Sequence, residues 1–332
     1  MASLTPASAA AIARLRAYVP PPTQYYNCPL ARRAAVLILL FADRKGDLRV
    51  VLTMRASTLK SYAGQAALPG GKADALNEAP FQTARREAYE EIGLPLSDAK
   101  LPPPFRVEHL TELPANLAKT ELAVRPCVAF LSAKPGAGST SSSKMPSVEE
   151  TMIPRLDAKE VAAVFTAPFH NFLRSKDEDE DAVRYSSASA AEFPGAEAAG
   201  FPAEWYQGTW TDWHESRWRM HNFFVPVGGQ SVARPRSKKG KGGDAASSEE
   251  KEQEETADAL AHLNRFRVFG MTARILVDAA RVAYAEEPDF EHNSHFGDEE
   301  MIARLLRAGR LSAERKRGQE LTREDLRAAA KL

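Results

Sequence analysis

A glycine pair followed by an acidic helix, at residues 70–94, sets the strongest limit on the structure of this chain. The run reads GGKADALNEAPFQTARREAYEEIGL. Pro80 suits the first helical turn, where no backbone N–H is needed, and Gly93 suits the left-handed residue that ends a helix. At about 100° per residue, three glutamates fall on one flank of this helix: Glu87, Glu90 and Glu91.

These carboxylates need a positive partner. Acids at i,i+3 and i,i+4 repel one another by roughly 0.2–0.5 kcal/mol per pair. Glu78 lies just before the helix and can fold back toward the same point. A hard cation such as Mg²⁺ prefers oxygen ligands and would turn this repulsion into binding.

The stretch resembles the Nudix box, which runs Gly, five residues, Glu, seven residues, Arg-Glu-apolar-any-Glu-Glu-any-Gly-apolar. The second half is complete, from Glu78 through Arg86 to Leu94. The first spacing differs, because six residues separate Gly71 from Glu78. The coenzyme A diphosphatase branch of the Nudix family carries the same one-residue expansion.

A second signature of that branch, Leu-Thr-any-Arg-Ser and then Pro-Gly-Gly-any-any-Asp, precedes the box. Residues 52–57, LTMRAS, and residues 69–74, PGGKAD, are similar to it. Two positions depart, because Ala56 separates the arginine from the serine and Leu68 replaces an aromatic residue. The departures affect the substrate assignment and leave the acidic cluster intact.

The competing interpretation is an ordinary solvated helix face. Helices rich in Arg and Glu usually carry i,i+4 pairs, here Arg86 with Glu90. A short acidic run, taken alone, can match such a motif by chance. The glycine pair, the complete second half of the box and Gly93 together favour the metal site.

The resemblance implies a bound Mg²⁺ or Mn²⁺ and a set of ligands: Glu78, Glu87, Glu90, Glu91 and the Gly71 carbonyl. It also implies four catalytic residues: Arg86, Glu87, Glu90 and Glu91. Arg86 would hold a glutamate of the cluster in position, because its planar fork suits carboxylates. Three residues of the branch signature are expected to contact substrate: Arg55, Gly70 and Lys72.

The function implied is metal-dependent cleavage of coenzyme A or acyl-CoA into adenosine 3′,5′-bisphosphate and (acyl-)4′-phosphopantetheine. One alternative is a general nucleoside-diphosphate pyrophosphatase that acts on ADP-ribose or NADH. A second alternative is a Nudix-fold binding module without turnover. The complete set of Arg86 and the glutamates that follow it argues against the second alternative.

The fold implied is α/β, a three-layer α/β/α Nudix sandwich with a mixed sheet, over residues 30–285. We expect a helix and Pro-rich lead at 1–29 and a helical tail at 286–332. Long insertions, interpreted as disordered linkers, are expected at 135–150, 175–200 and 234–257. Strands are expected at 34–42, 49–54, 105–112 and 122–131.

Three further segments are expected to complete the domain, and two helices are expected in the tail that follows it. Residues 156–173 resemble a Nudix strand and helix that carry a Glu-Val pair, and Glu160-Val161 match that pair. The aromatic stretch 205–227 reads as strands that close the core, with Trp218–Phe224 as candidate pocket lining. Residues 266–284 resemble the closing helix, and the helices at 299–307 and 322–331 are expected to be peripheral.

Composition excludes several function classes. The chain of 332 residues carries 44 basic and 44 acidic side chains, which gives no reason to expect nucleic-acid binding. The longest apolar run, at 34–42, has the length of a strand, so no membrane span is expected. The two cysteines, Cys28 and Cys127, offer neither a disulfide framework nor a zinc site and suit a reducing compartment.

The two ends of the chain bear on its compartment. The first 42 residues contain arginines and no acid, as a mitochondrial presequence does. We favour a helix at 7–17 that docks on the domain. The last three residues, Ala330-Lys331-Leu332, resemble the peroxisomal import signal, so the expected partner is the import receptor and the expected compartment is the peroxisome.

Overall fold

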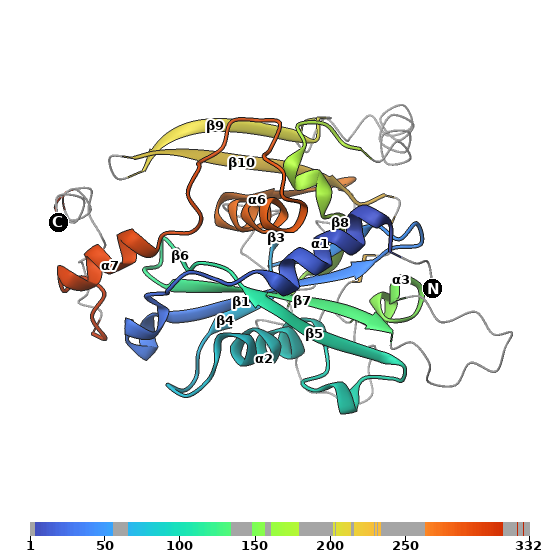
Figure 1. Cartoon of the computed structure of the whole chain (residues 1–332), viewed down its shortest axis with the longest axis horizontal. Coiled ribbons are helices and arrows are strands. Elements are labelled where there is room, and N and C mark those ends of the chain that lie inside the picture. The colour runs from blue at the N-terminus through green and yellow to red at the C-terminus, as the bar shows by residue number, and fades with distance from the viewer. Residues whose placement is uncertain are drawn as a thin grey trace, which may run out of the picture.

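A mixed β-sheet with helices against both faces forms the centre of the molecule (Figure 1). The structure is a computed structural model. It describes residues 4–55, 66–133, 148–156, 161–178, 202, 204–213, 216–228, 230, 232–233, 263–314, 324 and 328. Most of the three expected insertions, Glu160 and the C-terminal tripeptide lie outside the described residues.

The central strand is β1, Arg33–Ala42. It pairs antiparallel with β2, Leu48–Met54, and with β4, Gly70–Lys72, and parallel with β7, Ala123–Ala133. β7 in turn pairs antiparallel with β5, Phe105–Glu112, so the order is β3-β2-β1-β7-β5. Three short strands extend the sheet: β3 (Ala66–Ala67), β6 (Asn116–Leu117) and β8 (Ala163–Pro168). The expected strands at 34–42, 49–54, 105–112 and 122–131 are confirmed.

Both faces of β1 are buried. Leu37 and Leu39 pack with the helix α2, Pro80–Ile92. The alternate residues Ile38 and Leu40 pack with α6, Gly270–Tyr284. Because neighbouring side chains of a strand point to opposite faces, burial on both sides explains the uninterrupted apolar run. The α/β fold with helices on both sides of a mixed sheet is confirmed.

A second sheet covers α6 on the side away from the central sheet (Figure 1). Its three antiparallel strands are β11 (Arg265–Phe269), β10 (Ser216–Pro226) and β9 (Tyr206–Trp213). Phe223 of β10 is fully buried and stacks edge-on against Phe172 at 4.9 Å between ring centroids. The aromatic segment therefore closes the core, as expected.

Three expectations about helices need correction. The helix of the 266–284 segment begins at Gly270, because residues 265–269 form β11. Within the described residues 161–178, the helix that follows β8 is a short 3-10 helix, His170–Leu173, and not an α-helix. The helix α7, Glu299–Arg307, is not peripheral, because Ile302 and Leu305 are fully buried in a cluster that includes Tyr25.

The N-terminal helix α1, Pro6–Ala17, is docked on the domain. Ala11 and Leu15 are fully buried, and they belong to the same core as α6. The remaining described helical segments are short: Tyr25–Asn27, Leu30–Arg32, Asp98–Lys100, Val148–Thr151 and Ile153–Arg155. Across the described part of the chain, every helix falls short of the length and apolarity that a bilayer crossing requires.

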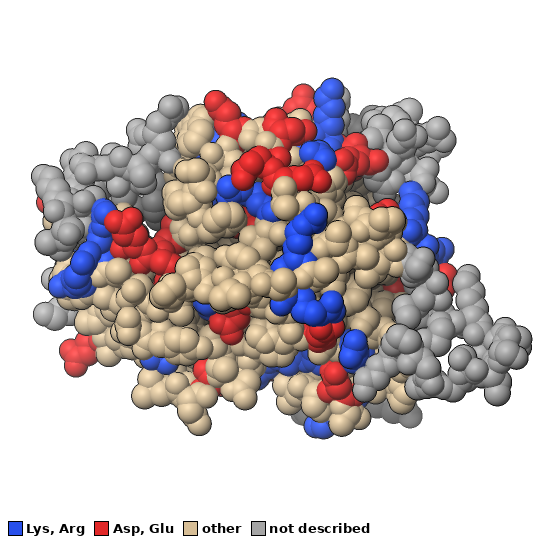
Figure 2. Space-filling view, in the orientation of Figure 1, with Lys and Arg blue, Asp and Glu red and all other residues tan. Residues whose placement is uncertain are grey.

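Charged side chains of both signs are interspersed over the face drawn in Figure 2. This distribution agrees with the equal numbers of acidic and basic residues, 44 of each. An extended single-sign surface is what steers nucleic acid or an acidic membrane to a protein. The face drawn in Figure 2 does not present one among its described residues.

Candidate functional site

The glutamate-bearing helix α2 is held against the sheet by three fully buried side chains: Ala84, Ala88 and Ile92. It ends at Gly93, which adopts φ 71° and donates its N–H to the Tyr89 carbonyl at 3.1 Å. The Leu94 N–H closes the turn on the Ala88 carbonyl at 3.3 Å. Because this apolar face is fixed, the neighbouring flank that carries the glutamates points toward the β4 strand and the loop that follows it.

Arg86 contacts three glutamates and one backbone carbonyl at that flank. Its Nε lies 3.0 Å from Glu78 Oε1, and its Nη1 lies 3.1 Å from Glu87 Oε1 and 3.3 Å from Glu90 Oε2. Its Nη2 donates to the Lys72 carbonyl at 2.8 Å. The i,i+4 pair of a solvated helix face is therefore present, but it is one contact of a guanidinium that also binds the loop.

The glycine pair lets two carboxylates approach the backbone. A Cβ on Gly71 would lie 2.4 Å from the carboxylate of Glu87, and a Cβ on Gly70 would lie 2.4 Å from the Ala35 carbonyl. At Gly70 the added atom would meet fixed backbone, so only glycine fits, whereas at Gly71 it would force the Glu87 carboxylate to move. The Gly70 N–H also donates to Glu91 Oε2 at 3.1 Å.

Burial and Arg86 shift the pKa values of the acids in opposite directions. Burial raises the pKa of Glu87 above its usual value, and the nearby Arg86 reduces this rise without cancelling it. Burial also acts to raise the pKa of Glu78, but hydrogen bonds from Arg86 and from the Asp74 N–H outweigh it and the pKa is lowered. Of these two acids, Glu87 therefore gains more from a further positive charge.

A cavity of about 470 Å³ opens on the other side of this glycine strand. All three residues expected to contact substrate line it: Arg55, Gly70 and Lys72. Apolar side chains also line the cavity: Val36 of β1, Leu122 just before β7, and Met271 of α6. Trp218–Phe224, the candidate pocket lining, is not among the residues that line this cavity, because Phe223 points into the core instead.

Sequence reasoning missed several residues of the site. Asp74 Oδ2 lies 3.2 Å from Arg86 Nε, a contact that the sequence signature does not predict. Arg32 lines the cavity and pairs with Glu121 at 2.6 Å, with both side chains 5% exposed. Ala313, about 240 residues along the chain from the glycine pair, also lines the cavity, and no local pattern indicates it.

The donor set suits a hard divalent cation. Carboxylate oxygens of Glu78, Glu87 and Glu90 converge on the Arg86 guanidinium, so the flank already binds positive charge. Oxygen-only donors are those that Mg²⁺ and Mn²⁺ prefer. The residues present therefore supply the donor type that the implied ion prefers, although no three of these described carboxylates have oxygens within 4.8 Å of one another.

Residues 31–122, which include the central strand, the glycine pair and α2, match the NUDIX domain profile. The chain therefore carries a Nudix domain. It is 35% identical over 179 residues to the peroxisomal coenzyme A diphosphatase 1 of Saccharomyces cerevisiae, a match that covers 52% of this chain and 53% of that protein. It is 39% identical over 145 residues to the mitochondrial Nudix hydrolase 15 of Arabidopsis thaliana, covering 44% and 43%.

The chain thus spans about half the length of the curated relatives it matches. Among solved structures, the Nudix hydrolase RenU of M. smegmatis aligns at 21% identity with a TM-score of 0.26. That alignment covers 42% of this chain and 73% of that chain. The fold described above rests on the strand pairing of the chain itself.

Proposed function

We propose that this protein is a metal-dependent diphosphatase that cleaves coenzyme A or acyl-CoA into adenosine 3′,5′-bisphosphate and (acyl-)4′-phosphopantetheine. The observation that carries the proposal is the position of the glycine strand. Gly70 and Gly71 contact the glutamates of α2 through Glu91 and Glu87, and they also line the 470 Å³ cavity. None of these glutamates lines the cavity itself, so under this proposal a bound substrate extends its diphosphate past the glycine strand to reach them.

Each side chain of the cluster has a role under this proposal. Glu87, Glu90 and Glu91, assisted by Glu78 and the Gly71 carbonyl, hold Mg²⁺ or Mn²⁺. When bound, such an ion neutralises charge on the diphosphate and lowers the pKa of a coordinated water. Arg86 orients Glu78, Glu87 and Glu90 by the hydrogen bonds described above, which keeps their oxygens on one side of the helix.

Basic side chains at the cavity complete the proposed substrate site. Arg55 and Lys72 line the cavity and are exposed, so both can reach phosphate oxygens. Arg32 lines the same cavity, but its charge is already balanced by Glu121. The similarity to the yeast coenzyme A diphosphatase supports coenzyme A over other nucleoside diphosphates.

A product assay tests the proposal. Purified protein with Mg²⁺ is incubated with coenzyme A, acetyl-CoA, ADP-ribose and NADH, and the products are separated. We expect adenosine 3′,5′-bisphosphate as the dominant nucleotide and no turnover with a chelator. Faster cleavage of ADP-ribose or NADH would replace the coenzyme A assignment with a general pyrophosphatase. Absence of turnover on all four would favour a binding module.

We also propose import into the peroxisome through Ala330-Lys331-Leu332. The yeast relative is named as peroxisomal and the Arabidopsis relative as mitochondrial, so the tripeptide is the feature that distinguishes the two compartments for this chain. A fluorescent protein fused before the chain should co-localise with a peroxisomal marker. Deletion of residues 330–332 should disperse it, and a mitochondrial pattern in the full chain would contradict the proposal.

A further inference from the structure

A β-bulge in β5 brings together three side chains of metal-binding type. His109 pairs with Ala129 of β7, but Glu112 pairs with Cys127, because the register shifts between His109 and Thr111. In a regular strand, residues three apart point to opposite faces. The extra residue of the bulge places His109 and Glu112 on the same face, and Cys127 lies on that face two residues from Ala129.

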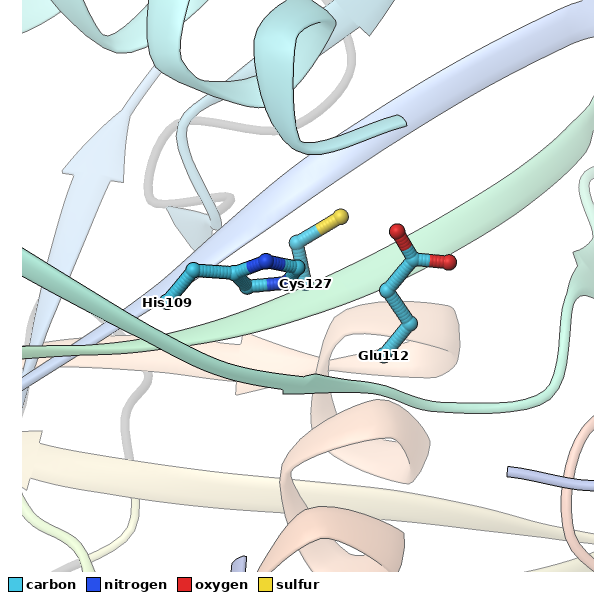
Figure 3. Close-up of side chains that lie close together, drawn as sticks. All are labelled: His109, Glu112 and Cys127. Atoms are coloured by element: carbon cyan, nitrogen blue, oxygen red, sulfur yellow. The ribbon is translucent and has the colours of Figure 1, made fainter. Parts of the chain in front are cut away.

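The result is a compact cluster of nitrogen, oxygen and sulfur donors (Figure 3). One ligand atom from each of His109, Glu112 and Cys127 lies within 4.8 Å of the other two. Among the described residues, this is the one group of at least three His, Cys, Asp or Glu side chains that meets that spacing. Cys127 is fully buried, whereas His109 is exposed and leaves a route from solvent.

Neighbouring side chains hold two of the three donors in place. The His109 imidazole stacks on Phe81 of α2, with ring centroids 4.1 Å apart and planes at 5°. Arg125, itself buried, donates from Nε to Glu112 Oε2 at 3.0 Å. That contact occupies one carboxylate oxygen and leaves the other for a ligand, which is the arrangement found around many metal-binding carboxylates.

We propose that His109, Glu112 and Cys127 form a binding site for a borderline divalent cation such as Zn²⁺. Imidazole, carboxylate and thiolate are the three ligand types that Zn²⁺ takes in proteins, and three protein ligands leave one position open. Binding exchanges the Cys127 S–H bond for a sulfur–metal bond and releases the proton to solvent. A thiolate donor disfavours Mg²⁺, so the site differs in chemistry from the glutamate cluster.

The site also lies on other strands than the glycine pair. Gly71 pairs with Ala35 of β1, and Ala35 pairs with Arg125 of β7. Two strand spacings, roughly 10 Å, therefore separate the glycine strand from the arginine that holds Glu112. The proposed cation site does not depend on the diphosphatase activity. Neither the number nor the spacing of the cysteines in the sequence indicates this site.

Cobalt substitution tests the site in the full-length protein. Co²⁺ bound by a thiolate gives an intense near-ultraviolet charge-transfer absorption that oxygen ligands do not give. Chelator-treated protein should develop this absorption with about one equivalent of Co²⁺, and added Zn²⁺ should abolish it. Cys127→Ser should remove the absorption, while Cys28→Ser, the matched change at the other buried cysteine, should retain it.

Two further variants keep the test decisive. His109→Ala changes an exposed side chain, so it should fold and should weaken Co²⁺ binding by about tenfold or more. Glu87→Gln, in the glutamate cluster, should leave the absorption unchanged. The proposal is overturned if the wild type shows no thiolate absorption, if the absorption survives Cys127→Ser, or if it survives His109→Ala with unchanged affinity.

Discussion

Arg86 Nε and Glu78 Oε1 lie 3.0 Å apart, although Glu78 precedes α2 and Arg86 lies in its second turn. The same guanidinium reaches the Lys72 carbonyl at 2.8 Å, so it links the helix to the glycine strand and to the loop between them. Removal of this link should change how the carboxylates are positioned more than it changes the stability of the fold.

Arg86→Lys tests that link. Lysine keeps the charge but cannot bind two carboxylates and a carbonyl with one planar group. We expect kcat/KM to fall by roughly 10- to 100-fold, as for other residues that orient metal ligands. Steady-state kinetics with coenzyme A measure it. Arg44→Lys, at a side chain that is 70% exposed, is the control and should be neutral.

Glu87→Gln removes the carboxylate that lies against Gly71. Loss of metal-assisted charge stabilisation worth several kcal/mol corresponds to a fall in kcat of roughly 100- to 1,000-fold or more. Burial already raises the pKa of Glu87, so loss of its charge should leave Tm within about 2 °C. Calorimetry checks the second result, and a collapse of Tm would indicate a structural role instead.

Gly71→Ala places a methyl group where Glu87 now lies, because the added Cβ would be 2.4 Å from its carboxylate. The carboxylate must move, so Mg²⁺ dependence should shift to higher concentrations and kcat should fall by at least about tenfold. Gly228→Ala is the matched control, since an added Cβ there meets nothing within 4 Å. Equal effects of the two variants would contradict the prediction.

A buried histidine makes stability depend on pH. Tyr206 Oη lies 3.0 Å from His221 Nδ1, and His221 Nε2 lies 3.0 Å from His292 Nδ1. Burial above all, with smaller contributions from His292, Arg219 and Arg274, lowers the pKa of His221 from 6.5 to about 3. Between these values the unfolded chain holds one more proton than the folded chain, so stability falls as pH falls.

The expected slope is about 1.4 kcal/mol per pH unit from this group within the window from about 6.5 down to about 3, with no contribution above it. Urea unfolding across that window measures the slope. His221→Gln keeps hydrogen-bonding capacity but does not titrate. The slope of its unfolding free energy against pH should therefore be smaller by about 1.4 kcal/mol per pH unit, which corresponds to one proton. Identical slopes in wild type and variant would show that His221 is not the group responsible.

The helix α7 should be needed for stability. Ile302 is fully buried in the cluster that contains Tyr25, so Ile302→Ala should lower the free energy of unfolding by about 2–4 kcal/mol. Met301→Ala, at the partly buried neighbour, should cost clearly less. Ala313, which follows this helix in the chain, lines the cavity. Loosening of the helix should therefore disturb the cavity wall and raise KM for coenzyme A.

The sequence alone determined the local elements. The capped helix of Pro80–Ile92, the apolar strand Arg33–Ala42 and the hairpin to Leu48–Met54 follow from periodicity, caps and turn residues, which act over a few positions. The carboxylates on one flank of α2 follow from the helical period. These features need no knowledge of distant contacts.

Only the tertiary structure decided which distant residues meet. Three features depend on contacts between segments far apart in the chain: the β5 bulge that places His109 beside Glu112, the burial of Ile302, and the position of Ala313 at the cavity. Local propensity does not specify register or docking, because packing of the whole core selects them.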